Sequence, residues 1–333
     1  MGYLHNVLKN NFNYEVTIML MKPNYYSILN EYMDACNIYE SYAMEADAAT
    51  GSGGDNGPGD NAAYKGNTRN QNSNNDSLND TNTLGKMNKS LSTMIANLVD
   101  KCKAAINAAL LRMQNRLKLL LETDKGYTRK LRERQIAVKP AQNLQITTYQ
   151  YNNTALKLIQ TKITAEYNKV LQYFVNIVAH PTEEKVKDID TTNPQAYINI
   201  MIQNATGNKE LKSVNAFFNY VKEKFRGKKV TYVYSAKQLP QIVKLSEDTS
   251  AYNALYNKCK MDGKKVLTNL DTLVKKFKYQ NPDNKEMYKK LVSAVNLMSQ
   301  VNTFYNAFLR YLSELYIERT MSYRAICKKF YQF

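Results

Sequence analysis

The sequence contains no tryptophan, only two histidines and only four cysteines, and each scarcity excludes a kind of chemistry. His5 and His180 lie far apart, and neither has a serine or cysteine beside it in a nucleophile motif. The cysteines have neither metal-ligand nor redox spacing. They are Cys36, Cys102, Cys259 and Cys327. We therefore expect free, mostly buried thiols in a reducing compartment, and no catalysis by imidazole.

Motifs for phosphate, metal and acyl chemistry are also missing. The chain has no glycine-rich phosphate loop, no GxSxG elbow, no HExxH and no EF-hand spacing. Carboxylates do pair in 182-TEEKVKDIDTTN-193, but a solvated connection explains that stretch better than an acid–base pair. We predict that the protein is not an enzyme and that it uses no metal or other cofactor.

Long hydrophobic runs are absent. The longest apolar run near the start, 16-VTIMLM-21, is far shorter than the roughly 20 residues that span a bilayer. Met1-Gly2 begins like a myristoylation signal, but Asn6 stands where that signal has serine or threonine. We expect a soluble, cytoplasmic protein without a membrane partner.

Glycine is scarce except in one segment, and this divides the chain. Six of the 12 glycines lie between Gly51 and Gly66, in a stretch almost free of large apolar residues. Such a stretch cannot bury enough surface to offset the entropy of ordering it. We predict an N-terminal helical arm over 1–49, a flexible polar linker or loop over 50–85, and a basic helical bundle domain over 86–333.

Apolar residues recur every three or four positions in three long segments, which indicates amphipathic helices. These are 24–47, which Asn24 would cap, 86–124, and 283–333. The stripe of the last includes Leu291, Val295, Met298, Tyr305, Leu309, Leu312 and Tyr316. Its seven-residue rhythm fits either a coiled coil with a partner or a bundle core, and we favour the core.

Glycine and proline outside the linker are interpreted as helix punctuation. We expect Gly126 to end the helix that starts at 86, and Gly263 to mark another break. Strand signals are confined to 144–151 and 229–235, which are β-branched and aromatic. The fold class predicted is mainly α: an elongated helical bundle with at most a minor β-ribbon.

Acidic residues are outnumbered by basic ones, 29 against 46, giving a net charge of +17. Such a charge attracts polyanions, but charge alone does not make a site. Tyr127 lies in the first basic cluster, Phe225 in the second, and Phe277 and Tyr279 in the last, where they could stack on single-stranded bases. The candidate contacts are Arg112, Arg116, Lys125, Arg129, Lys130, Arg132, Arg134, Lys224, Arg226, Lys228, Lys229, Lys275, Lys276 and Lys278. The alternative, which we favour, is that these are the solvated faces of helices.

Four stretches, taken in order, resemble uncharacterised virion-associated proteins of large tailed phages that infect gut Gram-positive bacteria. They are 25-YYSILNEYMDACNIYESY-42, 87-MNKSLSTMIANLVDKCKAAI-106, 120-LLETDKGYTRKL-131 and 215-NAFFNYVKEKFRGKK-229. The resemblance implies a structural or internal particle protein. It carries no functional residues. Because some large phages trim internal proteins after Ala-x-Glu, 43-AME-45 suggests processing after Glu45.

Two functional hypotheses follow from the sequence. The first is a non-enzymatic virion structural or internal protein, found in the virion and in infected host cytoplasm. It would form an oligomeric assembly with other virion or assembly proteins through helical and tyrosine-rich surfaces. The alternative is a DNA-binding or DNA-condensing protein of low sequence specificity that acts through the lysine and arginine clusters.

Overall fold

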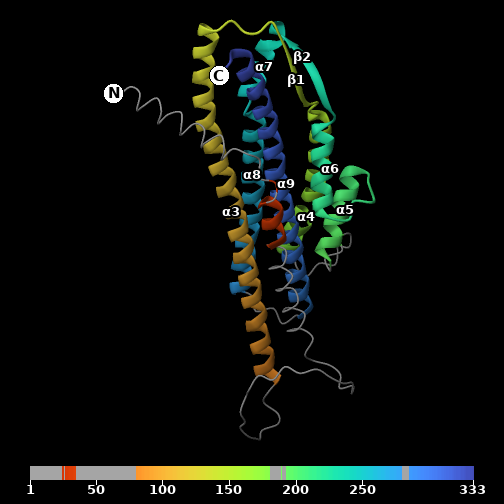
Figure 1. Cartoon of the computed structure of the whole chain (residues 1–333). Helices are drawn as coiled ribbons and strands as arrows, with labels where there is room; N and C mark the ends of the chain where they lie inside the picture. The colour runs from red at the N-terminus through yellow and green to blue at the C-terminus, as the bar shows by residue number, and fades with distance from the viewer. Residues whose placement is uncertain (1–24, 26, 35–79, 181–188, 190–192, 280–284) are drawn as a thin grey trace, which may run out of the picture.

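The computed structural model describes residues 25, 27–34, 80–180, 189, 193–279 and 285–333. These residues form a mainly helical fold with one small antiparallel sheet, which confirms the predicted fold class. Its long helices run side by side and give an elongated bundle (Figure 1). They are α3 (Asp80–Ala137), α4 (Asn153–Ala179), α8 (Ser250–Tyr279) and α9 (Lys285–Tyr331).

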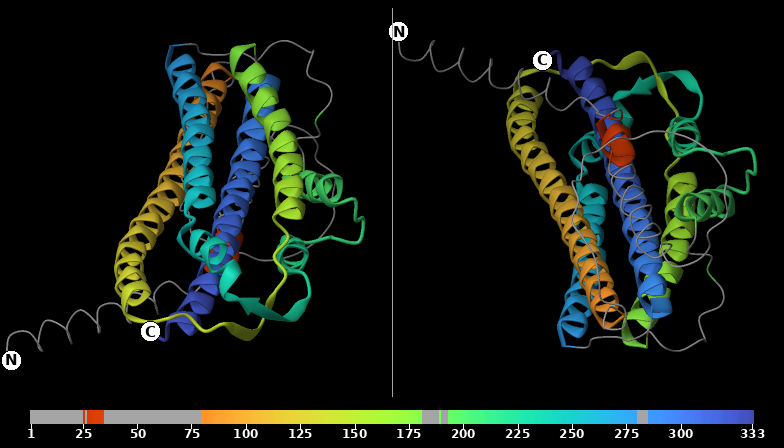
Figure 2. Two further views of the ribbon diagram at one scale, coloured as in Figure 1. Left: turned by 90° about the horizontal axis from the view of Figure 1, so that it is seen from above. Right: turned by 90° about the horizontal axis from the view of Figure 1, so that it is seen from below.

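Helix α9 lies at the centre of the bundle. Both views of Figure 2 place it between α3 and α8 on one side and α4 on the other, and it packs against all three. Between Leu291 and Thr320 nearly every side chain is buried, as a helix surrounded by other helices requires. All the residues of the stripe predicted for this helix are buried in the main core. The seven-residue spacing of these residues is therefore explained by packing in the bundle core.

Helix α3 is longer at both ends than predicted. It begins at Asp80, so residues 80–85, which we had assigned to the linker, are helical. It also continues through Gly126, and the prediction that this glycine ends it is wrong. Tyr127 and Leu131, both buried, extend its apolar face into a second cluster with residues of α7 and α9. Their burial outweighs the cost of about 1 kcal/mol for a glycine within a helix.

Gly263 was likewise misinterpreted, because α8 passes through it without a break. A Cβ placed there would lie 3.0 Å from Cγ2 of Ile106 on α3, so the missing side chain allows a close approach of two helices. Other breakers do mark helix ends. Pro194 opens α5 (Pro194–Thr206) and Gly207 caps it, while Gly227 caps α6 (Val214–Arg226).

The two predicted strands form the ribbon. β1 (Asn143–Tyr149) pairs antiparallel with β2 (Lys229–Ser235), with Ile146 opposite Tyr232. The first strand ends two residues earlier than predicted, because Asn152 caps α4 by accepting a hydrogen bond from the backbone N–H of Ala155. After β2, the short turn η1 (Ala236–Gln238) leads into α7 (Leu239–Glu247), which packs against α9.

Residue 25 and residues 27–34 are helical, in agreement with the prediction for this part of 24–47, and we call them the docked segment. It lies across the middle of α9 (Figures 1 and 2). Ile28 and Tyr32 are buried in the main core. The other residues of the predicted arm and most of the linker lie outside the described residues, as do His5, Glu45 and most of 182–193.

Candidate functional site

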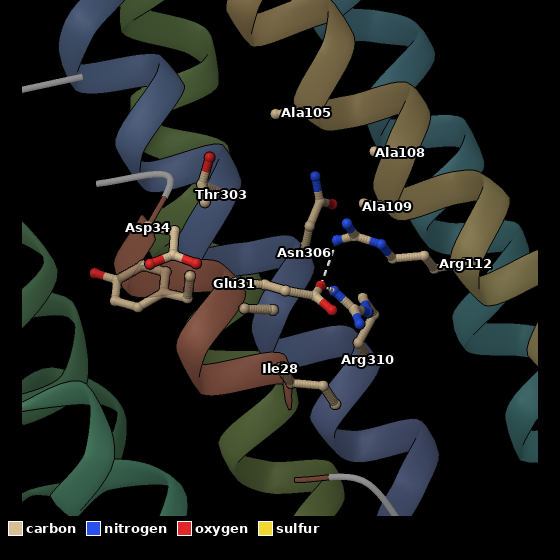
Figure 3. A pocket seen from close by; sticks show the side chains of 12 residues that line it. Ile28, Glu31, Asp34, Ala105, Ala108, Ala109, Arg112, Thr303, Asn306 and Arg310 are labelled. Atoms are coloured by element: carbon tan, nitrogen blue, oxygen red, sulfur yellow. Dashed lines mark hydrogen bonds and ion pairs between the residues drawn. The ribbon is translucent and has the colours of Figure 1, made fainter. Parts of the chain in front are cut away.

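The docked segment is bound to the bundle by a carboxylate held between two arginines, an arrangement that we call the clamp. Glu31 forms ion pairs with Arg112 of α3 and Arg310 of α9 (Figure 3). The Arg310 side chain is only 14% exposed. Burial alone would raise the pKa of Glu31, but the hydrogen bond and charge of Arg310 outweigh it, so this pKa lies below its usual value. The clamp therefore holds an ionised carboxylate at neutral pH.

A cavity of about 260 Å³ lies beside this clamp, between the docked segment, α3 and α9. Ala105, Ala108 and Ala109 form its wall on α3, and their small side chains leave the space open (Figure 3). On α9 it is bordered by Asn306, whose side-chain oxygen accepts a hydrogen bond from the Cys259 thiol at 3.4 Å. The docked segment thus covers a groove between α3 and α9 that side chains fill only in part.

A second contact anchors the start of the docked segment. The hydroxyl of Tyr25 donates a 2.5 Å hydrogen bond to Glu318 of α9. Arg226 at the end of α6 donates two hydrogen bonds of 2.7 Å to the same carboxylate. Burial and the neighbouring Glu318 raise the pKa of Tyr25, so the phenol stays protonated and remains a donor. Lys222 lies over the Tyr25 ring, 4.5 Å from its centroid.

A third contact completes the seat, which we define as the surface of α3, α5, α6 and α9 that receives the docked segment. The Tyr32 hydroxyl donates to the side-chain oxygen of Gln195 on α5 at 3.2 Å. Its ring meets Phe304 of α9 edge-on, with centroids 6.2 Å apart. One short segment therefore joins four helices that are far apart in sequence.

Beyond the seat, α9 carries buried polar side chains that tie it to its neighbours. Glu314 receives two hydrogen bonds from Arg116 of α3, at 2.9 and 2.8 Å. Arg319 pairs with Asp248 at 3.1 Å, and Arg324 pairs with Asp124 of α3 at 2.5 Å. From the sequence, Arg116 was predicted only as a polyanion contact, and the other residues of these pairs were missed. The available signal was a set of charges interrupting the apolar pattern of this helix.

A pair of stacked tyrosines also joins α9 to neighbouring helices inside the core. Tyr167 of α4 and Tyr305 of α9 stack with centroids 3.9 Å apart. Tyr167 donates to Asn302 and Tyr305 donates to Asp262 of α8, both at 3.1 Å. The two hydroxyls are hydrogen-bonded to polar side chains in the core. These hydrogen bonds fix the alignment of α4, α8 and α9 relative to one another.

The predicted polyanion contacts fall into two groups. Arg112, Arg116 and Arg226 form ion pairs with carboxylates of this chain, so we remove them from the candidate surface. The aromatic prediction is wrong at Tyr127 and Phe225, because both rings are fully buried and cannot stack on bases. The side chains of Lys276, Phe277, Lys278 and Tyr279 lie outside the described part of the chain.

The remaining basic residues do not share one surface. Lys275 is exposed near the end of α8, whereas the last turns of α3 lie at the opposite end of the bundle (Figure 1). Lys224, Lys228 and Lys229 are exposed at the end of α6 and the start of β2, and Lys130 is half-buried. One group is dense, and we call it the basic end. It comprises the exposed residues Lys125, Arg129, Arg132, Arg134, Lys139, Lys237, Lys244 and Lys329.

The described cysteines are free and buried, as predicted: Cys102, Cys259 and Cys327. Burial raises the pKa of Cys102 to about 11 and that of Cys259 to about 12, so neither is a thiolate at neutral pH. His180 follows the last residue of α4, as expected. Within the described residues, no three His, Cys, Asp or Glu side chains gather as metal ligands. Among the helices described, none is both long and apolar enough to span a bilayer.

Comparisons with models of protein families, with curated proteins and with solved structures find no match. The fold and the site together define a helical bundle that carries a docked N-terminal segment. The resemblance to phage virion proteins stays a prediction.

Proposed function

We propose that the protein is a non-enzymatic structural or internal protein of a phage particle, and that it works by contacting other protein subunits. The main support is the docked segment. It is separated from α3 by residues 35–79, yet it is bound to the bundle through specific side chains at three points. A short helix bound in this way to a distant surface is a common means of linking subunits.

The exposed apolar side chains also support an assembly role. Leu111 on α3 and Met261 on the neighbouring α8 are 57% and 63% exposed, and Val233 on the ribbon is 65% exposed. The expected tyrosine-rich surface needs revision, because many tyrosines, including Tyr167 and Tyr252, lie in the core. The contact surface proposed is therefore more aliphatic than the composition suggested.

Mass spectrometry of purified particles from the source system tests the proposal. We expect peptides of this protein at a fixed ratio to the major structural subunits. The same spectra report processing, because cleavage after Glu45 would give an N-terminus at Ala46. Absence from particles, together with abundance in the infected cell, would rule out the structural role.

A second candidate function, contact with DNA or another polyanion, is favoured by the basic end. Its exposed arginines and lysines come from α3, the α3–β1 connection, η1, α7 and α9, which converge at one end of the bundle. Exposed charges of one sign at one end of the molecule create a local positive potential that attracts polyanions.

Reversing three charges of the basic end tests this second function. We expect Arg129→Glu/Arg132→Glu/Arg134→Glu to weaken DNA binding and to reduce the slope of log affinity against log salt by about 2 to 3, one phosphate contact per residue. A matched control is Lys260→Glu/Lys264→Glu/Lys265→Glu, which changes net charge equally at exposed positions of α8. Equal losses in both variants would show that binding follows net charge alone.

A further inference from the structure

We infer that the docked segment is exchangeable between copies: residues 25–34 of one chain occupy the seat of a second chain. The inference rests on the proposed assembly function and names one partner for it, another copy of this chain.

The docked segment depends on the seat for its structure. A helix of about ten residues is marginal by itself in water, so its stability comes from packing. Ile28 and Tyr32 are 3% and 2% exposed in the seat. On the bundle, the hydrogen-bond partners of Tyr25, Glu31 and Tyr32 lie between 81 and 293 residues away in sequence. None of these contacts requires that the segment and the seat belong to the same copy.

The seat also requires a particular segment. With Glu31 removed, Arg310 would remain as a largely buried charge without this carboxylate, which is strongly unfavourable. Tyr25 supplies a hydroxyl to Glu318, and Ile28 and Tyr32 fill apolar positions on the same face as Glu31. The seat therefore selects Tyr25, Ile28, Glu31 and Tyr32 at their spacing, a pattern that every copy carries.

The number of residues between the docked segment and α3 sets the protein concentration at which the segment of another copy competes with the chain's own segment. Residues 35–79 number 45. As a reference, a random coil of that number of residues spans roughly 35–40 Å, which corresponds to an effective concentration in the millimolar range. In dilute solution each seat holds its own segment. When the protein is itself near millimolar, as in a packed particle, a second copy competes, and two copies that trade segments form a closed pair.

An isotope-mixing experiment on the full-length chain tests exchange. Arg112→Lys keeps the positive charge beside Glu31 and supplies an amine that a carbodiimide can couple to the carboxylate. Copies of this variant labelled with ¹⁴N and ¹⁵N are mixed in equal amounts, incubated at about 1 µM or about 1 mM, and cross-linked. Mass spectrometry then analyses the peptide pair that joins Glu31 to the new amine, which we call the clamp link.

We expect clamp links of a single isotope at the low concentration. At the high concentration we expect a clear mixed-isotope fraction. Its upper limit is roughly half, the value that random pairing gives when every seat holds another copy's segment, and competition from the chain's own segment keeps it below that limit. The Lys103–Asp271 pair, 2.6 Å apart between α3 and α8, is the internal control and must stay single-isotope throughout. Its behaviour shows whether the bundle itself has remained intact.

Two results would overturn the inference. Clamp links of a single isotope at both concentrations would show that the segment binds only its own bundle. The lack of any clamp link would show that Glu31 does not occupy the seat. Neither result affects the particle analysis described above, so failure of exchange and failure of the assembly function are separate outcomes.

Discussion

Replacing Glu314 by leucine is expected to lower the free energy of unfolding by about 3 to 5 kcal/mol. Arg116 donates two hydrogen bonds to this carboxylate, and the two side chains are only 16% and 8% exposed. Removing the acid takes this carboxylate away from a largely buried guanidinium, and solvent cannot replace it fully. Urea unfolding followed by circular dichroism measures the change.

Two further variants separate the effect of removing a buried partner carboxylate from the effect of losing a charge at an exposed position. The double variant Arg116→Met/Glu314→Leu should recover most of the lost stability, because an apolar pair of similar volume leaves no buried charge. Asp271→Asn, which breaks the more exposed pair with Lys103, should cost less than about 1 kcal/mol. If the double variant is as unstable as the single one, the loss of stability comes from packing and not from leaving Arg116 without the Glu314 carboxylate.

Gly227→Ala is expected to cost about 3 kcal/mol or more. Gly227 has φ 59° and ψ −153°, a backbone region essentially restricted to glycine. A Cβ there would also lie 2.7 Å from the backbone oxygen of Gln150. That contact lies where the chain passes from α6 into β2, so relieving it would disturb the backbone hydrogen bonds on either side, from Gln150 N–H to Lys228 O at 3.0 Å and from Asn152 N–H to Phe225 O at 2.7 Å.

Gly207→Ala is the matched control, since Gly207 also caps a helix with positive φ, at 69°. Its conformation is left-handed helical and a Cβ would meet nothing within 4 Å, so only the backbone term of about 1 to 2 kcal/mol applies. Thermal or urea unfolding of the two variants gives the comparison. A loss at Gly227 no larger than that at Gly207 would show that the contact with Gln150 relaxes freely.

Apolar periodicity was sufficient to predict most of α3 and α9, and β-branched and aromatic residues were sufficient to predict the ribbon, because these patterns are local. Neither α4 nor α8 was predicted as a separate helix. The prediction failed at Gly126 and Gly263, where glycine was taken as a stop. Both lie inside helices because contacts with distant residues decide the outcome: Tyr127 is buried beside Gly126, and Ile106 faces Gly263. The sequence shows that a glycine destabilises a helix locally, but it does not show the packing energy that outweighs this cost.

The ion pairs of the seat and of α9 were harder to predict than the fold. Arg112, Arg116 and Arg226 were read as exposed cations, because their partners Glu31, Glu314 and Glu318 lie 81, 198 and 92 residues away. A partial signal existed in α9, where Glu314, Glu318, Arg319 and Arg324 lie among apolar residues that recur on every face of the helix. Charges within such a helix indicate buried ion pairs, although they do not identify the partners.

The central position of α9 has a consequence for biosynthesis. It is the last described helix to leave the ribosome, yet α3, α4, α7 and α8 all pack against it. At roughly 5 to 20 residues per second, its 47 residues take several seconds to be made. During that time the earlier helices lack the partner that covers their apolar faces. The nascent chain is therefore a strong client for chaperones, and folding is completed only after translation has passed Tyr331.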